Sequence, residues 1–185
     1  MYKLLEPVSE KEFSSTCTIK VHNILEGMND YKYGILEVKD PVEEEKTFES
    51  YNLKYEDRFI NFLEKVYDIN KEESVMVDFY LKNIEADGIL KMLDVLDYED
   101  RLILINHLKY LKGENIYFKI SHKDLMPFIT RLSTRELHFC TIYFNKIPLV
   151  VWGNYNLSFP IFCKEQQQLD FYRKVAEDYG IFMRK

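Results

Sequence analysis

The chain has 185 residues, of which 46% are hydrophobic and 15% aromatic, with only six glycines and five prolines. This composition excludes disordered, low-complexity and collagen-like chains and predicts a polypeptide that folds by itself. The formal net charge of −6 is divided unevenly along the chain, because residues 1–100 sum to 12 − 24 = −12 and residues 101–185 to 13 − 7 = +6. This separation favours electrostatic complementarity, either between the two halves or with an outside partner.

The first predicted element is a β-hairpin. Residues 16–25 alternate apolar and polar side chains, and a second β-prone run covers 31–38. The tetrapeptide 27–30 between them has turn chemistry. A solvated loop is predicted next, because Asp40-Pro41 is a turn signal and a run of carboxylates follows it: Glu43, Glu44, Glu45 and Glu49.

The middle of the chain is predicted to be mainly helical. Apolar residues recur at helical spacing over 52–67, which indicates an amphipathic helix. Residues 74–82 alternate as in a strand with one buried face. Two helices, 85–96 and 98–112, are predicted to form an antiparallel pair, the second burying Leu102, Ile105 and Leu108. Asp97 and Asp100 near their junction are typical of a helix N-terminus.

The last third is predicted to be mostly strands. A short strand at 116–120 and a helix ending near 132 precede a β-meander of 139–144, 149–152 and 157–163. Pro160 cannot donate to a ladder, so we expect its strand at an edge or a bulge. A helix at 165–179 and a strand at 181–183 complete the chain. The sequence thus predicts one α+β domain over 1–185 with a mainly antiparallel sheet; acidic 1–100 and basic 101–185 are possible sub-structures.

Three features suggest where the protein works. The first residues lack the apolar core of a secretory signal, and no apolar run approaches the roughly 20 residues of a membrane span. The three cysteines form no CxxC pair, which suits a reducing compartment. We therefore expect a cytoplasmic protein that avoids membranes. The abundance of Lys, Ile, Asn, Tyr and Phe favours a bacterial or phage origin.

Catalytic motifs are scarce. The chain contains no GxGxxG, no P-loop, no GxSxG and no HExxH. One enzyme hypothesis remains, a metal-dependent nuclease in which Asp30 and Glu37 hold a divalent cation and Lys39 stabilises negative charge. A Glu-x-Lys triplet also occurs often by chance in so charged a chain.

A zinc site is the second chemical alternative. His138 and Cys140 share one face of a predicted strand, and Cys163 lies on a strand that the meander brings near. A fourth ligand is missing, and cysteines on apolar strands are usually core residues. We therefore expect no metal and no cofactor.

The basic half suggests nucleic-acid binding as a third alternative. Six cations lie around the second helix of the pair and the elements after it, interspersed with tyrosines: Lys109, Lys112, Lys119, Lys123, Arg131 and Arg135. The acidic character of the whole chain opposes this interpretation.

The leading hypothesis is a non-enzymatic protein that binds and inhibits or neutralises a macromolecular partner, as immunity proteins and phage inhibitors do. The partner is expected to be a protein with a basic surface. Its predicted contacts are the carboxylates of the acidic loop, Glu43, Glu44, Glu45 and Glu49, which would steer association. Trp152 and Tyr155, beside the turn at 153–156, are candidate anchors. Self-association of the acidic half with the basic half, as a homodimer, is a further alternative.

Overall fold

The computed structural model describes residues 4–39, 48–80, 83–111 and 115–185. Within these residues one sheet has the strand order β1-β4-β3-β5-β6-β7-β2-β8, and all its neighbours are antiparallel. The strands are β1 (Glu6–Val8), β2 (Lys32–Glu37), β3 (Met76–Asp78), β4 (Tyr117–Lys119), β5 (Thr141–Phe144), β6 (Leu149–Trp152), β7 (Phe159–Cys163) and β8 (Phe182–Arg184). The helices are α1 (Glu10–Thr16), α2 (Ile24–Asp30), α3 (Phe48–Asn70), α4 (Ala86–Val95), α5 (Tyr98–Tyr110), α6 (Met126–Thr134) and α7 (Gln166–Glu177), with 3₁₀ turns η2 (Lys123–Leu125) and η3 (Tyr155–Leu157). The predicted α+β class with an antiparallel sheet is confirmed.

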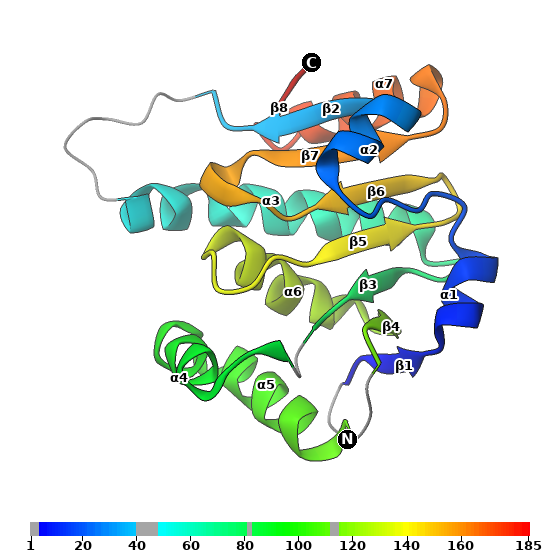
Figure 1. Cartoon of the computed structure of the whole chain (residues 1–185). Helices are drawn as coiled ribbons and strands as arrows, with labels where there is room; N and C mark the ends of the chain where they lie inside the picture. The colour runs from blue at the N-terminus through cyan, green and yellow to red at the C-terminus, as the bar shows by residue number, and fades with distance from the viewer. Residues whose placement is uncertain (1–3, 40–47, 81–82, 112–114) are drawn as a thin grey trace.

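Helices cover both faces of the sheet. In Figure 1, α3, α6 and α7 lie behind the strands, whereas α2 lies in front of them and α1 to the right. Successive residues of a strand point to opposite faces. Val77 and Ile142 accordingly join the larger core under α3, α6 and α7, while Met76 and Tyr143 join a smaller core under α1 and α2. The strand predicted at 74–82 is therefore shorter than expected and buried on both faces rather than one.

Strands of the acidic and basic halves alternate in this sheet. β4, from the basic half, lies between β1 and β3, and β2, from the acidic half, lies between β7 and β8. Neither half forms a sheet of its own within the described residues. The two halves are therefore joined by ladder hydrogen bonds as well as by a shared core.

The long helix α3 confirms the helix predicted at 52–67 and extends it to Phe48–Asn70. Phe59, Phe62, Leu63 and Val66 are buried, as their spacing on one helix face requires. α3 packs along α6, and both press against the sheet. The two central helices, the β-meander β5-β6-β7 and the final helix are also confirmed.

The N-terminal hairpin is wrong, although its second predicted strand, 31–38, is present as β2, which pairs with β7 and β8. The segment 17–23 contains no strand, although its alternating Cys17, Ile19 and Val21 are all buried in the smaller core. Asn23 accepts a hydrogen bond from the Glu26 amide and so caps α2. Gly27 therefore lies inside a helix instead of in a turn. The alternation indicated burial correctly, but it did not require a ladder partner.

The prediction for Pro160 is also wrong, because β7 is an interior strand between β6 and β2. Pro160 pairs with Ile35 of β2. On the other side, the pairing of β7 with β6 ends at Ile161, opposite Val151. The proline thus lies just past the end of one ladder, which is why an interior strand tolerates it.

Gly27 provides a test of this packing. A Cβ at this position would lie 2.5 Å from Cε1 of the buried Phe162 ring. We predict that Gly27→Ala destabilises the protein by about 1–3 kcal/mol through overpacking, although alanine is better than glycine in a helix by about 1 kcal/mol. Urea unfolding measures the change. Asn29→Ala, at an exposed position of the same helix, is the control and should not destabilise. A stabilised Gly27→Ala variant would contradict the packing.

Candidate functional site

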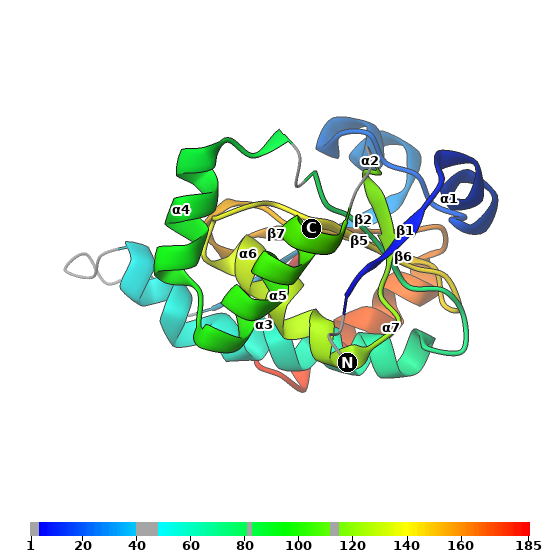
Figure 2. The same cartoon turned by 90° about the horizontal axis from the view of Figure 1, so that it is seen from below.

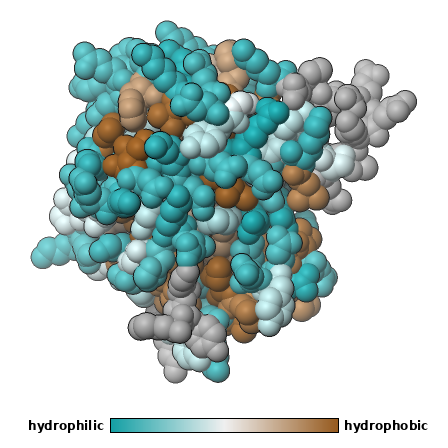
Figure 3. Space-filling view, turned by 180° about the vertical axis from the view of Figure 1, so that it is seen from behind, coloured by the Kyte–Doolittle hydropathy of each residue, from teal (hydrophilic) through white to brown (hydrophobic). Residues whose placement is uncertain are grey.

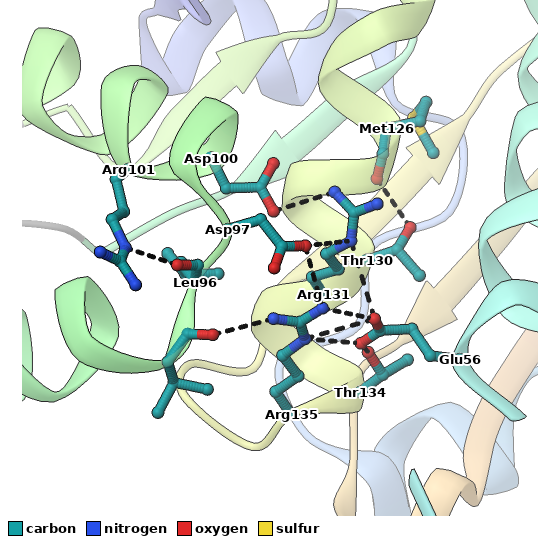
Figure 4. Close-up of polar contacts among 11 residues, drawn as sticks. Glu56, Leu96, Asp97, Asp100, Arg101, Met126, Thr130, Arg131, Thr134 and Arg135 are labelled. Atoms are coloured by element: carbon teal, nitrogen blue, oxygen red, sulfur yellow. Dashed lines mark hydrogen bonds and ion pairs between the residues drawn. The ribbon is translucent and has the colours of Figure 1, made fainter. Parts of the chain in front are cut away.

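A cluster of buried charges joins three helices (Figure 4). Arg131 and Arg135 lie one turn apart on α6, and both reach Glu56 on α3 and the junction of α4 and α5. Arg135 holds Glu56 with two hydrogen bonds, 2.7 Å from Nη2 to Oε1 and 2.9 Å from Nε to Oε2. Thr134 donates a further bond of 2.7 Å to the same carboxylate. Glu56 is therefore a fully paired buried charge.

The same arginines hold the α4–α5 junction. Arg131 Nη1 donates to Asp100 over 2.9 Å, and Arg135 Nη1 donates to the carbonyl of Val95 over 2.9 Å. Asp97 adds a contact of 3.3 Å to Arg135 Nη2. Burial raises the pKa of Asp100, and the Arg131 guanidinium opposes that rise. The Glu56 carboxylate raises the pKa of Arg135. Both guanidinium groups are thus engaged inside the molecule.

Ion pairs of this kind connect the acidic half to the basic half at several places. Cations after residue 100 pair with carboxylates before it: Lys123 with Asp68 and Glu64, Arg131 and Arg135 as above, Lys146 with Glu72, and Arg184 with Glu37. Part of the charge separation along the sequence is therefore neutralised by ion pairs between the two halves. Three of the six cations considered for nucleic acid, Lys123, Arg131 and Arg135, are engaged in this way, and Lys112 lies outside the described residues.

The residues predicted to bind a partner are scattered. Glu43, Glu44 and Glu45 lie outside the described residues, as does the side chain of Glu49, the second residue of α3. Trp152 is half-buried against the smaller core, whereas Tyr155 is 59% exposed at η3. Of this set, the described structure offers only Tyr155 as an exposed anchor.

The nuclease residues do not converge. Glu37 is bound by Arg184, with 2.8 Å from Nη2 to Oε1, and this contact lowers the pKa of Glu37. Asp30 ends α2, before β2 begins, while Glu37 ends β2, whose length is about 16 Å at 3.3 Å per residue. Lys39 lies over the Phe182 ring. Asp30 and Glu37 therefore cannot hold one cation in this structure.

The zinc residues are separated as well. The carbonyl of Cys140 pairs with the Gly153 amide before β5 begins, whereas Cys163 ends β7 at the opposite end of the meander. Burial raises the pKa of both thiols, to about 12 for Cys163, so neither is a thiolate at neutral pH. Among the described residues, no group of three His, Cys, Asp or Glu side chains is placed to hold a metal.

The main surprise is the orientation of α5. Leu102, Ile105 and Leu108, predicted to be its buried face, are 39%, 45% and 43% exposed. The buried residues of α5 are Asp100, Leu104, Asn106 and His107 instead. At about 100° per residue, Leu102 and Ile105 lie on the side of the helix away from Asp100 and His107, whereas Leu108 lies nearer to the buried stripe. The predicted face of α5 is therefore wrong, and its apolar side faces solvent.

Long-range partners explain why a polar stripe is buried. Asp100 bonds to Arg131, as described above. His107 accepts the Leu5 amide at Nε2 over 2.9 Å, and its Nδ1 lies 2.8 Å from the Ile103 carbonyl. The ring is thus a neutral imidazole with both nitrogens bonded, and burial lowers its pKa. Asp100 and His107 thus each find a partner that the local sequence does not reveal.

Helices α4 and α5 carry more than half of the exposed large hydrophobic residues in the described part of the chain. We call this set the apolar face: Leu90, Val95, Tyr98, Leu102, Ile105, Leu108 and Tyr110. Figure 2 shows both helices on the outside of the molecule, α5 across α6 and α4 to its side. From behind, hydrophobic residues also show among hydrophilic ones in the lower part of the view, where these helices lie (Figure 3). An exposed apolar patch on a folded protein marks an interaction surface.

A pocket of about 480 Å³ adjoins the apolar face at Val95. Its walls come from the start of α3, the end of α4, the segment after α6, and η3. Leu53, Val95 and Tyr155 supply exposed apolar and aromatic surface, and Lys91 and Glu136 supply opposite charges. A volume of this size falls in the range of small-ligand sites, roughly 300–1,000 Å³.

Comparison with protein-family models, with curated proteins and with solved structures gives no match for this chain. No helix in the described residues has the length and apolar character needed to cross a membrane.

The charge cluster gives a test of stability. We predict that Arg135→Ala costs about 3–5 kcal/mol, because it leaves the buried Glu56 carboxylate without its main partner. Urea unfolding is the measurement. The control is Lys146→Ala, which removes the more exposed pair with Glu72 and should change stability little. Equal losses for the two variants would show that the cluster does not hold the helices together.

Asp78 gives a test of pH dependence. Its side chain is buried in β3 beside Thr141, whose amide donates to it, and burial raises its pKa to about 6. The folded state therefore binds this proton more tightly than the unfolded chain, whose carboxyl titrates near 4. The contribution of the Asp78 carboxyl to the free energy of unfolding is fully present below about pH 4 and is lost as the pH rises through about 6.

The matched variant is Asp78→Asn, whose side-chain oxygen still accepts from Thr141. We predict that its free energy of unfolding, relative to wild type, rises between pH 4 and pH 7 by an amount on the order of 3 kcal/mol. Urea unfolding at a series of pH values measures the difference. A difference that stays constant with pH would mean that Asp78 is ionised throughout.

Proposed function

We propose that this protein binds a protein partner through the apolar face of α4 and α5. It acts by binding alone, because the bound surface of the partner is then blocked. The observation that carries the proposal is the solvent-facing stripe of α5. Tyr98, Leu102 and Ile105 follow one another at spacings of four and three, so they line one side of the helix. Burying such side chains stabilises a complex by about 1.5–3 kcal/mol each.

Contacts within the molecule support this assignment. The body of the protein already uses the opposite side of α5, through Asp100, Leu104 and His107. Turning the helix to bury its apolar stripe would expose Leu104 and break the bonds of Asp100 and His107 with Arg131 and Leu5. The apolar face is thus kept at the surface by the fold, as a docking surface requires.

Charge supports a partner with basic groups. On α4, α5 and their N-caps the exposed carboxylates outnumber the exposed cations: Glu85, Asp87, Asp94, Asp97 and Glu99 against Lys91, Arg101 and Lys109. Five cations of the basic half are paired with carboxylates of the acidic half, so they offer little attraction to an outside anion. The chain as a whole carries −6. A basic partner is therefore favoured by steering as well as by contacts at the rim.

A capture experiment tests the proposal. Wild-type protein, the double variant Leu102→Ser/Ile105→Ser, and Leu25→Ser are each immobilised and incubated with lysate of the organism that encodes the chain. Leu25 is 74% exposed on α2, away from the apolar face, and is the matched control. We predict that a protein retained by wild type and by Leu25→Ser falls about tenfold or more with the double variant. Quantitative mass spectrometry measures the retained proteins.

Two further measurements complete the experiment. Circular dichroism and urea unfolding establish that the double variant is folded, as expected for exposed positions. Retention should also weaken when NaCl is raised from about 50 mM to about 0.5 M, because rim charges are then screened. If wild type and the folded double variant retain the same proteins to the same extent, the apolar face is not the docking surface.

A further inference from the structure

The pocket beside the apolar face has an unusual wall. Among the described residues, the non-glycine positions with left-handed backbone are Glu136, Asn156 and Leu157, with φ of 54°, 58° and 51°. Glu136 lines the pocket, and the other two belong to η3, whose Tyr155 also lines it. Such conformations cost on the order of 1–3 kcal/mol each, persist only where surrounding contacts impose them, and collect at functional sites.

Glu136 explains how the wall is held. It follows α6, at the left-handed position after a helix where glycine is normally preferred. Its Oε1 accepts the Asn156 amide over 2.8 Å and thereby joins the end of α6 to η3. Its second oxygen, Oε2, accepts no hydrogen bond from the described residues. One carboxylate oxygen of Glu136 thus accepts a hydrogen bond within the protein, and the other can accept one from a molecule bound in the pocket.

The negative charge available to an occupant of the pocket is that of Glu136. Arg135 also lines it, but its guanidinium is bonded to Glu56, Asp97 and the Val95 carbonyl. The arginines of the charge cluster behind the wall are neutralised by their own carboxylates, Arg131 by Asp100 and Arg135 by Glu56. Glu136 Oε2 is then the carboxylate oxygen of the wall that an occupant can reach. Lys91, on an exposed turn of α4, is the group that opposes a cationic occupant.

The shape and chemistry of the walls are suited to a flat cation with an apolar stem. Tyr155 presents an exposed ring, held edge-on by Phe139 with 4.5 Å between centroids. Leu53 and Val95 provide aliphatic surface. A guanidinium group stacks on aromatic rings and pairs with carboxylates, and the stem of an arginine packs on apolar walls. We propose that this pocket accepts an arginine side chain of the partner, between Tyr155 and Glu136.

This inference rests on the proposed function, because it takes the arginine to belong to the protein that docks on the adjacent apolar face. Val95 belongs to both surfaces. A partner that buries its own apolar residues against α4 and α5 therefore has the pocket within reach of a neighbouring long side chain. The pocket would then select partners, while the apolar face supplies most of the binding energy.

The test uses purified full-length protein and a small probe. Nα-acetyl-arginine methylamide is titrated against the protein and followed by ¹H–¹⁵N NMR; its uncharged isostere, Nα-acetyl-citrulline methylamide, is the control ligand. We expect saturable shifts of pocket amides with a dissociation constant in the millimolar range, and binding of the citrulline compound weaker by about tenfold. Saturation confined to the pocket supports the proposal. Equal binding of both probes, shifts elsewhere only, or no saturable shift would overturn it.

Two variants with opposite expected signs sharpen the test. Glu136→Gln keeps an oxygen that accepts the Asn156 amide but removes the charge, and should weaken arginine binding by about tenfold. Lys91→Gln removes the opposing cation and should strengthen it by about twofold to threefold. Unchanged binding in both variants would overturn the assignment. Leu102→Ser/Ile105→Ser should bind the probe as wild type does, so this titration fails or succeeds independently of the capture experiment.

Discussion

The rest of the structure depends on the two arginines of α6 and the carboxylates that they hold. Glu56 is buried on α3, where an unpaired charge would be costly, and Arg135 satisfies it with a bidentate contact. The same two guanidinium groups bind Asp97, Asp100 and the Val95 carbonyl, so the orientation of α4 and α5 is coupled to the neutralisation of Glu56. Because Asp100 must point inward to reach Arg131, Leu102, two positions further along α5, points outward. The exposed apolar face is thus a consequence of how a buried charge is paired.

Periodicity predicted the elements whose burial is governed by apolar contacts alone. α3, α7 and the strands β5, β6 and β7 each place apolar residues at the spacing of the surface they bury, so their pattern and their structure agree. The segment 17–23 shows the limit of this reasoning, because its alternating residues fill the smaller core without joining the sheet. Alternation reports which side chains are buried, whereas a strand also needs a backbone partner. That partner depends on distant residues, which a single sequence does not disclose.

The candidate site was less predictable for the same reason. The sequence pointed to Tyr155 and to the unusual charge distribution, but it assigned the apolar stripe of α5 to the core. The error arose because polar residues were assumed to face solvent. Asp100 and His107 are buried since each meets a partner far along the chain, Arg131 and the Leu5 amide respectively. The pocket itself was not foreseen, because its walls come from four separate segments. The sequence signal for it is the presence of Glu136 directly after α6, where glycine would avoid backbone strain.

The charge cluster also links the apolar face to the pocket. Arg135 and Glu136 are consecutive but bind different parts of the protein. Arg135 binds Glu56 and the α4–α5 junction, and Glu136 binds η3. A single turn of chain therefore sets both the position of the helices that carry the apolar face and the position of Tyr155. Exposed ion pairs such as Lys146 with Glu72 contribute little to such positioning, since water and salt screen them. Buried pairs with several hydrogen bonds impose one geometry, because each displaced partner would leave a desolvated charge. The charge separation along this sequence is thus used, at its most buried point, to hold two surfaces in a fixed relation to one another.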